Sequence, residues 1–255
     1  MNLQIDPVLL YIAGYPVIRW YSVAYILGFV CVYLLFKKYA KFANHEQTEA
    51  LFNYGFFGVI LGGRIGYCLF YNLAFCIENP FEVFKIWNGG MSFHGGLLGV
   101  IIGLVIACKK HKIDVKKVMD IAPLCVTPGL FFGRIANFIN GELWGSETNL
   151  PIGFIFPQSG DFSPRHPTQL YEAFFEGLVI FVIMFALYRK KQDYNGTLFG
   201  LFLVLYGFFR FLIEFLRQPD AHIGYIFLET FTMGHLLCFA MVLGGFAVMF
   251  FGKKI

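Results

Sequence analysis

Seven apolar runs alternate with short polar segments along the chain. They cover residues of about 17–36, 49–70, 92–108, 119–138, 170–188, 197–216 and 229–251. A helix that crosses a membrane needs about 20 mostly apolar residues, because the hydrocarbon core of a bilayer is about 30 Å thick. The pattern therefore predicts an all-α polytopic membrane protein with seven transmembrane helices.

Basic residues between the runs predict how the helices are oriented. Clusters follow the first, third, fifth and last runs, at Lys37, Lys38 and Lys41, at Lys109, Lys110, Lys112, Lys116 and Lys117, at Arg189, Lys190 and Lys191, and at Lys253 and Lys254. Loops rich in lysine and arginine stay in the cytoplasm. We therefore expect the N-terminus outside and the C-terminus in the cytoplasm.

Composition agrees with a membrane protein of one domain, residues 1–255. The chain is 58% hydrophobic and only 14% charged, whereas about a quarter of the residues of a soluble domain are charged. Residues 71–91 mix aromatic and charged side chains and predict an amphipathic arm at the membrane interface. Residues 139–169 are rich in glycine, proline, serine and asparagine, and predict a small extracytoplasmic head.

The arginines are distributed differently from the lysines. Outside the cytoplasmic clusters there are six arginines and one lysine, namely Arg19, Arg64, Lys85, Arg134, Arg165, Arg210 and Arg217. A guanidinium group binds phosphate or carboxylate with two parallel hydrogen bonds, whereas lysine serves as a hydrated anchor. An arginine inside a membrane costs about 2.5–3.5 kcal/mol on insertion scales and is a functional-site hypothesis by default. Their positions predict an anion-binding site near the outer leaflet.

Two polar stripes lie within or at the end of apolar runs. The stretch GRIANFINGELWG ends the fourth run and contains Arg134, Asn137, Asn140, Glu142 and Gly145. The sixth run places a second set on one helical face, with spacings of i, i+4, i+8 and i+11, at Tyr206, Arg210, Glu214 and Arg217. Glu214 can pair with either arginine, and the second arginine then leaves a spare positive charge. That excess favours anion binding over a purely structural ion-pair network.

Other candidates lie at the ends of the remaining runs. Arg64 shares a face with Tyr67 and Tyr71, and His94 stands directly before two glycines in MSFHGG. Histidine titrates near neutral pH and suits general base catalysis, although hydrogen bonding alone is the commoner role for one at an interface.

The fifth run and the glycines carry weaker signals. In RHPTQLYE, Pro167 predicts a helix start. Glu172 and Glu176 share a face that capping and surface charge largely explain, although Glu176 lies deeper and needs a partner such as an arginine. Glycines spaced by four predict close helix packing that brings Arg64, His94 and Arg134 together. These glycines are Gly58, Gly62 and Gly66, Gly95, Gly99 and Gly103, and Gly129 and Gly133.

Five segments together resemble the bacterial prolipoprotein diacylglyceryl transferases over nearly the whole chain. They are GGRIGYCLFYN (62–72), MSFHGG (91–96), GRIANFINGELWG (133–145), RHPTQLYE (165–172) and YGFFRFLIEFLRQPD (206–220). Ala136 stands where a glycine is common in the family. The resemblance implies a multi-pass enzyme of the bacterial cytoplasmic (inner) membrane, with interfacial arms, a periplasmic head and an active site towards the periplasmic leaflet.

The resemblance also implies the reaction. Such an enzyme transfers the sn-1,2-diacylglyceryl group of phosphatidylglycerol to the thiol of the lipobox cysteine in a prolipoprotein signal peptide. A thioether forms and glycerol phosphate leaves, as the first step of lipoprotein maturation. Its expected partners are these two substrates and membrane lipids; we expect no cofactor, metal or nucleic acid.

The resemblance assigns roles to residues of this chain. Arg134 and Arg210 match the critical phospholipid-site residues of the family. Further positions are implicated, at Tyr21 or Tyr25, His94, Asn137, Glu142, Gly145 and Tyr206. We expect His94 to act as the base and Tyr206 to orient it. Arg64, Asn140, Glu214 and Arg217 complete the expected substrate-binding set.

Two other functions use the same residues. A phospholipid transporter or flippase could hold anionic head groups with the same arginines, but it predicts polar residues through the full depth of the spans. Here the charges cluster towards the outer half. In a purely structural bundle, no ligand would offset the free-energy cost of placing arginines within the membrane spans, which disfavours that alternative.

Overall fold

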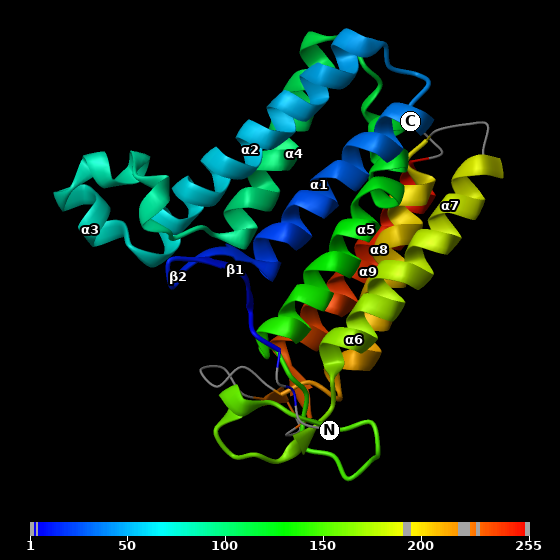
Figure 1. Ribbon diagram of the computed structural model, residues 1–255. Helices are drawn as coiled ribbons and strands as arrows, with labels where there is room; N and C mark the ends of the chain where they lie inside the picture. The colour runs from blue at the N-terminus through cyan, green and yellow to red at the C-terminus, as the bar shows by residue number, and fades with distance from the viewer. Residues whose placement is uncertain (1–2, 4, 191–194, 219–224, 228–229, 253–255) are drawn as a thin grey trace. The chain divides into compact units, whose positions relative to one another are not determined.

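The computed structural model describes residues 3, 5–190, 195–218, 225–227 and 230–252 (Figure 1). Lys191, Lys253 and Lys254, used above to predict orientation, lie outside the described residues, as do Pro219 and Asp220 of the fifth motif. The described chain is mostly helical. It packs as two compact units, Met1–Tyr39 with Met119–Ile255, and Ala40–Val118.

The first unit contains most of the apolar helices. They are α1 (Trp20–Tyr39), most of α5 (Val115–Asn140), α6 (Thr168–Glu172), a π-helical segment η4 (Ala173–Val179), α7 (Ile180–Lys190), α8 (Thr197–Glu214) and α9 (Met233–Phe251). Five described segments are long and apolar enough to cross a membrane: α1, α5, the continuous stretch Thr168–Lys190, α8 and α9. The membrane character is thereby confirmed, and the seven-span count stays a prediction.

Small residues and one buried carboxylate fix the helices of this unit. A methyl group on Gly28 of α1 would lie only 3.2 Å from the α-carbon of Gly129 on α5. The Asp120 carboxylate on α5 accepts the Gly196 N–H at 3.1 Å and the Leu198 N–H at 2.8 Å. The first N–H groups of a helix lack partners within the helix and carry its positive dipole end. Asp120 therefore determines where α8 begins.

The second unit is built on two helices that run side by side (Figure 1). These are α2 (His45–Tyr71) and α4 (Phe93–Lys110). Methyl groups on Gly58 or Gly62 of α2 would collide with the Gly99 backbone of α4, and one on Gly66 would lie 2.7 Å from the Gly95 α-carbon. The predicted glycine packing is confirmed for this pair. A methyl group on Gly133 of α5 would meet nothing within 4 Å, so this glycine is not at a close helix contact.

The predicted arm follows α2 as a chain of short helical turns. It consists of α3 (Leu73–Glu78) and the 3₁₀ turns η1 (Pro80–Phe84) and η2 (Ile86–Asn88). Phe81 and Trp87 are 79% and 75% exposed. Large aromatic side chains facing outwards are typical of a membrane-interface element. The position of the arm in an interface stays a prediction.

Within the described residues, three short pairs of antiparallel strands are additions to the expected all-α fold. β1 (Val8–Ile12) pairs with β2 (Tyr15–Arg19), and β5 (Tyr225–Phe227) pairs with β6 (Phe231–Thr232). The first hairpin turns at Ala13 and Gly14, both with positive φ. A two-residue turn with positive φ at both positions and a glycine is a hairpin signal. The sequence reading missed it because the flanking runs are as apolar as the spans.

The predicted head contains the third strand pair, β3 (Phe154–Ile155) with β4 (Pro164–Arg165). Phe156 is fully buried there, with the Phe138 and Trp144 rings each 6.0 Å from its own. The Arg165 guanidinium pairs with the Asp161 carboxylate and holds the pKa of that carboxyl well below its usual range. The head thus has an aromatic core and an ion pair between Arg165 and Asp161.

We expect Gly99→Ala to destabilise the second unit. The added methyl group meets backbone atoms of Gly58 and Gly62 that cannot rotate away, and overpacking of this kind costs about 1–3 kcal/mol. Thermal unfolding followed by circular dichroism in detergent should show a lower midpoint. Gly244→Ala on α9 is the matched control, since its methyl group would meet nothing within 4 Å. Equal midpoints for the two variants would contradict the packing argument.

Candidate active site

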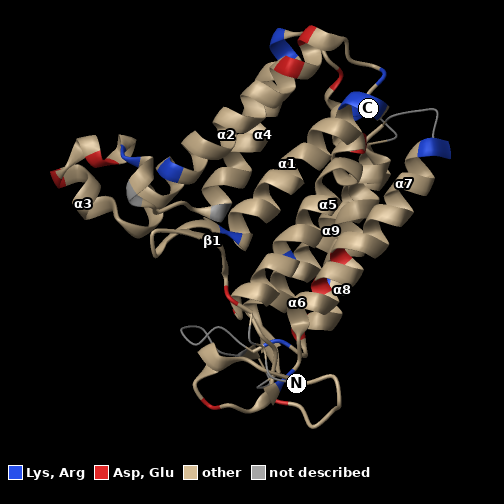
Figure 2. Ribbon diagram, in the orientation of Figure 1, with Lys and Arg blue, Asp and Glu red and all other residues tan. Residues whose placement is uncertain are grey.

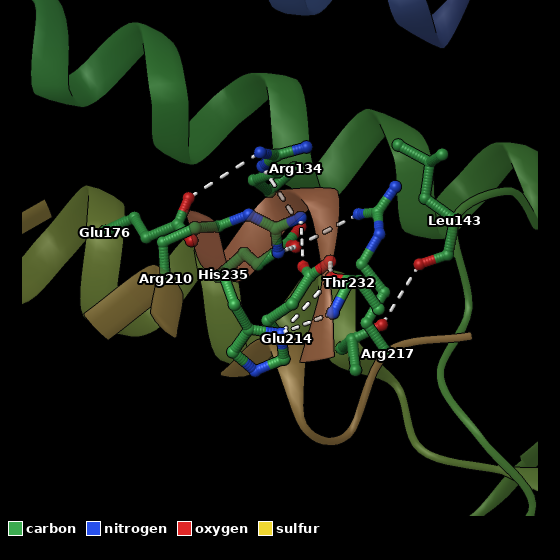
Figure 3. A network of polar contacts seen from close by, with 10 residues as sticks. Arg134, Leu143, Glu176, Arg210, Glu214, Arg217, Thr232 and His235 are labelled. Carbon is green, nitrogen blue, oxygen red and sulfur yellow. Dashed lines mark hydrogen bonds and ion pairs between the residues drawn. The ribbon is translucent and has the colours of Figure 1, made fainter. Parts of the chain in front are cut away.

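Three arginines and three glutamates meet inside the first unit (Figure 3). The Glu172 carboxylate contacts all three guanidinium groups. Its Oε2 lies 3.1 Å from Arg134 Nε, and its Oε1 lies 2.5 Å from Arg210 Nη1 and 3.3 Å from Arg217 Nη1. Helices α5, α6 and α8 are thereby joined at one buried carboxylate.

The other two glutamates pair with the same arginines. Glu214 Oε2 lies 2.7 Å from Arg210 Nη2, and Glu176 Oε2 lies 3.6 Å from Arg134 Nη2. The Tyr206 hydroxyl lies close to both Arg134 and Glu176. The deeper glutamate of the fifth run therefore has the arginine partner that the sequence suggested.

Burial makes these ion pairs strong determinants of the structure. Glu172 and Glu176 are 0% exposed, and the three arginine side chains are between 14% and 20% exposed. A buried charge is tolerated only when it is paired and hydrogen-bonded. The expectation that capping and surface charge largely explain this pair is wrong for Glu172, which is buried in the helix bundle, whereas Glu176 lies deep and has an arginine partner as expected.

The charge balance of the cluster differs from the expectation based on α8 alone. The predicted stripe holds on α8 only as far as Glu214, because the helix ends there and Arg217 lies beyond it in a bridge with Gly145. Two further glutamates, Glu172 and Glu176, come from α6 and η4. The six described groups carry three positive and three negative formal charges, so α8 contributes no unmatched positive charge here. A guanidinium has five N–H donors, more than these pairs use, and so each arginine retains capacity for a further acceptor.

A local feature of the backbone places the two glutamates. Between α6 and α7 the chain forms the π-helical segment η4, which begins directly after Glu172 and contains Glu176. π-Helical turns are rare and frequently lie at functional sites. Gly177 in the same segment lies against Phe131 of α5, where a methyl group would be 2.7 Å from the phenylalanine β-carbon. The segment therefore brings both carboxylates close to α5.

The predicted polar residues at the end of α5 form a second group. The Asn137 amide donates to Glu142 Oε1 at 2.7 Å, and the Asn140 amide donates to the same oxygen at 3.4 Å. Gln169 Nε2 donates to the Glu142 carbonyl at 2.6 Å. Both asparagines thus hold the glutamate carboxylate.

Gly145 lies where the head meets the end of α8. Its N–H donates to the His166 carbonyl at 2.8 Å, and its backbone forms an isolated bridge with Arg217. A methyl group on Gly145 would collide with the Leu216 carbonyl. Glycine is needed here because only a bare α-carbon lets this loop approach the backbone that carries Arg217.

The two N-terminal candidates stack on α1. The Tyr21 and Tyr25 ring centroids are 5.1 Å apart, and Tyr25 lies within electrostatic range of Glu142. Tyr25 is therefore a neighbour of the α5 group.

Arg64 and His94 belong to the second unit, whereas the residues described above belong to the first. Arg64 Nε donates to the Val83 carbonyl at 3.0 Å, Nη1 to Gly89 at 2.5 Å and Gly90 at 3.2 Å, and Nη2 to Glu82. All four acceptors are backbone carbonyls of the arm. His94 is an exposed residue in the first turn of α4, next to the N-cap Ser92. Arg64 therefore clamps the arm, a contact that its helical stripe did not reveal.

The sequence reading missed two residues beside the cluster. Thr232 Oγ1 donates to Glu214 Oε1 at 2.6 Å, and His235 Nδ1 accepts the Thr232 N–H at 3.1 Å (Figure 3). The available signal was the spacing Thr-x-x-His before an apolar run. It resembles a capping box, in which the second residue is usually glutamate or glutamine.

Comparison with known proteins gives a consistent result. The family model described as prolipoprotein diacylglyceryl transferase matches residues 7–251. The phosphatidylglycerol–prolipoprotein diacylglyceryl transferase of Ehrlichia ruminantium (strain Welgevonden) is 50% identical over 251 residues, 97% of this chain and 96% of the relative. The protein of the same name from Ehrlichia canis (strain Jake) is 52% identical over 233 residues, 90% and 89% of the two chains. That from Oleidesulfovibrio alaskensis is 48% identical over 241 residues, 93% and 90%.

We expect Arg64→Ala to release the arm. The variant leaves four partly buried hydrogen bonds unmade, and a hydrogen bond to a charged donor contributes about 1.5–3 kcal/mol. Amides of residues 73–90 should therefore exchange hydrogen about tenfold faster or more by mass spectrometry. Lys85→Ala is the control, because Lys85 forms a partly exposed pair with Glu82, and such pairs contribute little. If hydrogen exchange in the arm is unchanged but the variant binds phospholipid more weakly, the result would instead favour a substrate-binding role for Arg64.

Proposed function

This chain belongs to the prolipoprotein diacylglyceryl transferase family, and we propose that its buried arginine cluster binds the phosphate of the lipid donor. The chain is a membrane transferase that moves a diacylglyceryl group from phosphatidylglycerol to a prolipoprotein. The observation that carries the proposal is the convergence of Arg134, Arg210 and Arg217 on one buried carboxylate.

The proposed reaction is a displacement at carbon. The thiol sulfur of the lipobox cysteine attacks the glyceryl carbon that bears the phosphate ester of phosphatidylglycerol. A carbon–sulfur bond forms as the carbon–oxygen bond breaks, and glycerol phosphate leaves with the bonding electrons. The thiol proton passes to a base. The product is an sn-1,2-diacylglyceryl thioether, and phosphorus itself is never attacked.

Arginine donors at the phosphate would accelerate this step. Negative charge grows on the departing phosphate oxygens, and preorganised donors in a site that excludes water stabilise such charge most strongly. Arg134 and Arg210 are held by carboxylates, so little reorganisation is needed when the phosphate arrives. The Arg134–Glu176 contact is the longest in the cluster, at 3.6 Å. A phosphate oxygen can therefore compete for that side of the Arg134 guanidinium.

The remaining predicted residues have proposed roles around this site. Asn137 and Asn140 hold Glu142, which we assign to the head-group side of the site with Gly145 and Tyr25. His94 is the proposed base, with Tyr206 orienting the reacting groups. A base is needed because a cysteine thiol has a pKa near 8.5, so only a few per cent is thiolate at neutral pH.

The proposed membrane arrangement has seven spans, with α2 and α4 completing the set. The N-terminus is outside, the C-terminus is in the cytoplasm, and the site faces the periplasmic leaflet of the inner membrane. In the first unit, the basic ends of α1 and α7 lie away from the head (Figure 2). In the second unit, α4 ends at Lys109 and Lys110, away from the arm. Both observations support this orientation under the positive-inside rule.

We expect Arg134→Ala and Arg210→Ala each to abolish most of the transfer. Loss of one preorganised donor at a developing oxyanion lowers kcat by about 10²–10³-fold. Purified protein with phosphatidylglycerol and a lipobox peptide is assayed for glycerol phosphate release and for the diacylglyceryl mass gain of the peptide. Lys190→Ala, at the basic end of α7, is the control. Full activity in both arginine variants would contradict the phosphate-binding role. If the protein in lipid vesicles moves phosphatidylglycerol across the bilayer without consuming it, that result would favour a lipid transporter.

We expect His94→Gln to slow the reaction most at neutral pH. A positioned base contributes about 10²–10⁴-fold, and the variant should recover part of this loss towards pH 9 as the peptide thiol ionises by itself. The measurement is kcat for the wild type and the variant between pH 6 and pH 9. A constant ratio of the two rates across this range would remove His94 as the base.

A further inference from the structure

The first turn of α9 supports one side of the arginine cluster. Thr232 Oγ1 donates to Glu214 Oε1 at 2.6 Å, and Glu214 Oε2 lies 2.7 Å from Arg210 Nη2. These contacts form a short chain from the α9 N-terminus through Glu214 to Arg210 (Figure 3). Arg210 is held on its other nitrogen, Nη1, by Glu172 at 2.5 Å. The two carboxylates therefore fix the direction of the guanidinium from both sides.

The helix cap determines which way the Thr232 hydroxyl points. Thr232 is the N-cap of α9, and its side chain accepts the backbone N–H of His235 in a capping box. The hydroxyl oxygen also lies 3.2 Å from His235 Nδ1, but that nitrogen already accepts the Thr232 backbone N–H. The hydroxyl proton is therefore left to bond to Glu214, at 2.6 Å. A rotating hydroxyl elsewhere would have no such preference. The cap thus makes Thr232 a directed donor.

His235 completes the cap. Its Nδ1 accepts the Thr232 backbone N–H at 3.1 Å, so the ring proton of this arrangement lies on Nε2. The side chain is buried, and the rings of Phe211 and Phe215 lie 4.9 Å and 4.4 Å from the imidazole. Packing on these rings keeps the imidazole in the orientation that the cap needs.

Gly234 leaves room for the carboxylate on this turn. A methyl group on its α-carbon would collide with the Glu214 carboxylate. Glu214 therefore lies directly against the first turn of α9, where the helix dipole is positive and favours an anion. The cap, the hydroxyl contact and the glycine are three separate features that all fix Glu214.

We propose that Thr232, Gly234 and His235 are positioning residues, which hold Glu214 and through it aim Arg210 at the departing phosphate. The inference rests on the proposed function, because it assigns a purpose to the direction of Arg210. Catalytic groups must be held within about 0.5 Å of their working geometry. A displacement of about 1 Å can cost 10²-fold in rate. A mobile Glu214 would let Arg210 turn towards Glu172 alone.

The test uses the full-length purified enzyme in the transfer assay with phosphatidylglycerol and a lipobox peptide. We expect Thr232→Val to lower kcat by about 10–100-fold, with KM for the peptide unchanged. Thr232→Ser should restore kcat to within about threefold, since it keeps the hydroxyl and the cap. His235→Gln should retain activity because a glutamine carbonyl can accept the Thr232 N–H, whereas His235→Leu should resemble Thr232→Val.

A double-mutant cycle decides whether Thr232 acts through Glu214. If it does, Thr232→Val lowers kcat strongly in the wild type and adds little once Glu214→Ala is present. Multiplicative losses in the double variant would overturn the proposal. So would a Thr232→Val enzyme that melts earlier but keeps the kcat and KM of the wild type, because that result describes a structural cap only.

The failure of this inference is distinguishable from failure of the proposed function. If Arg134→Ala and Arg210→Ala retain wild-type activity, the phosphate-binding role is wrong whatever Thr232 does. If both arginine variants are inactive while Thr232→Val, Thr232→Ser and the wild type have equal kcat, the arginine cluster acts as proposed and the positioning role is wrong.

Discussion

The structure of the first unit depends on one buried carboxylate, Glu172, which contacts three guanidinium groups. Without it, three like charges from α5, α8 and the segment just after α8 would face one another with little water to screen them. With it, each arginine has an anionic partner, and the three helices share a fixed register at this level. Removal of one member of a buried ion pair costs far more than an exposed pair contributes. Helix packing and the candidate active site are therefore the same set of contacts.

A site built in this way must serve two states of the enzyme. When the site is empty, Glu172, Glu176 and Glu214 satisfy the arginines. When phosphate is bound, the same guanidinium groups must offer N–H donors that the glutamates do not use. Their orientation must also stay the same as in the empty site. The contacts divide this work, because Glu172 and Glu214 hold different nitrogens of Arg210, whereas Glu176 holds Arg134 at a longer distance. The firmest contacts set the geometry, and the longest is the one that a ligand can replace.

Much of this arrangement could be predicted from the sequence. The rest could not be predicted, for a physical reason. Apolar runs and residue spacing identify helices and the residues that share a face, so the helical segments, the glycine faces of α2 and α4 and the α8 stripe from Tyr206 to Glu214 follow from them. Spacing within one helix does not say which side chains of other helices it meets. The pairing of Glu172 with three arginines was therefore missed, as was the attachment of Arg64 to the arm carbonyls. His235 was missed because a histidine in a capping box departs from the usual residue types.

The buried Asp120 carboxylate has a mechanical consequence for α8. It accepts N–H groups at the start of this helix, and Glu172 pairs with Arg210 and Arg217 near the end. Axial sliding of α8 by one turn, about 5.4 Å, would break both sets of contacts at once. α8 therefore behaves as a strut that is anchored at each end. A rearrangement of this unit that keeps both sets of contacts therefore cannot slide α8 along its axis.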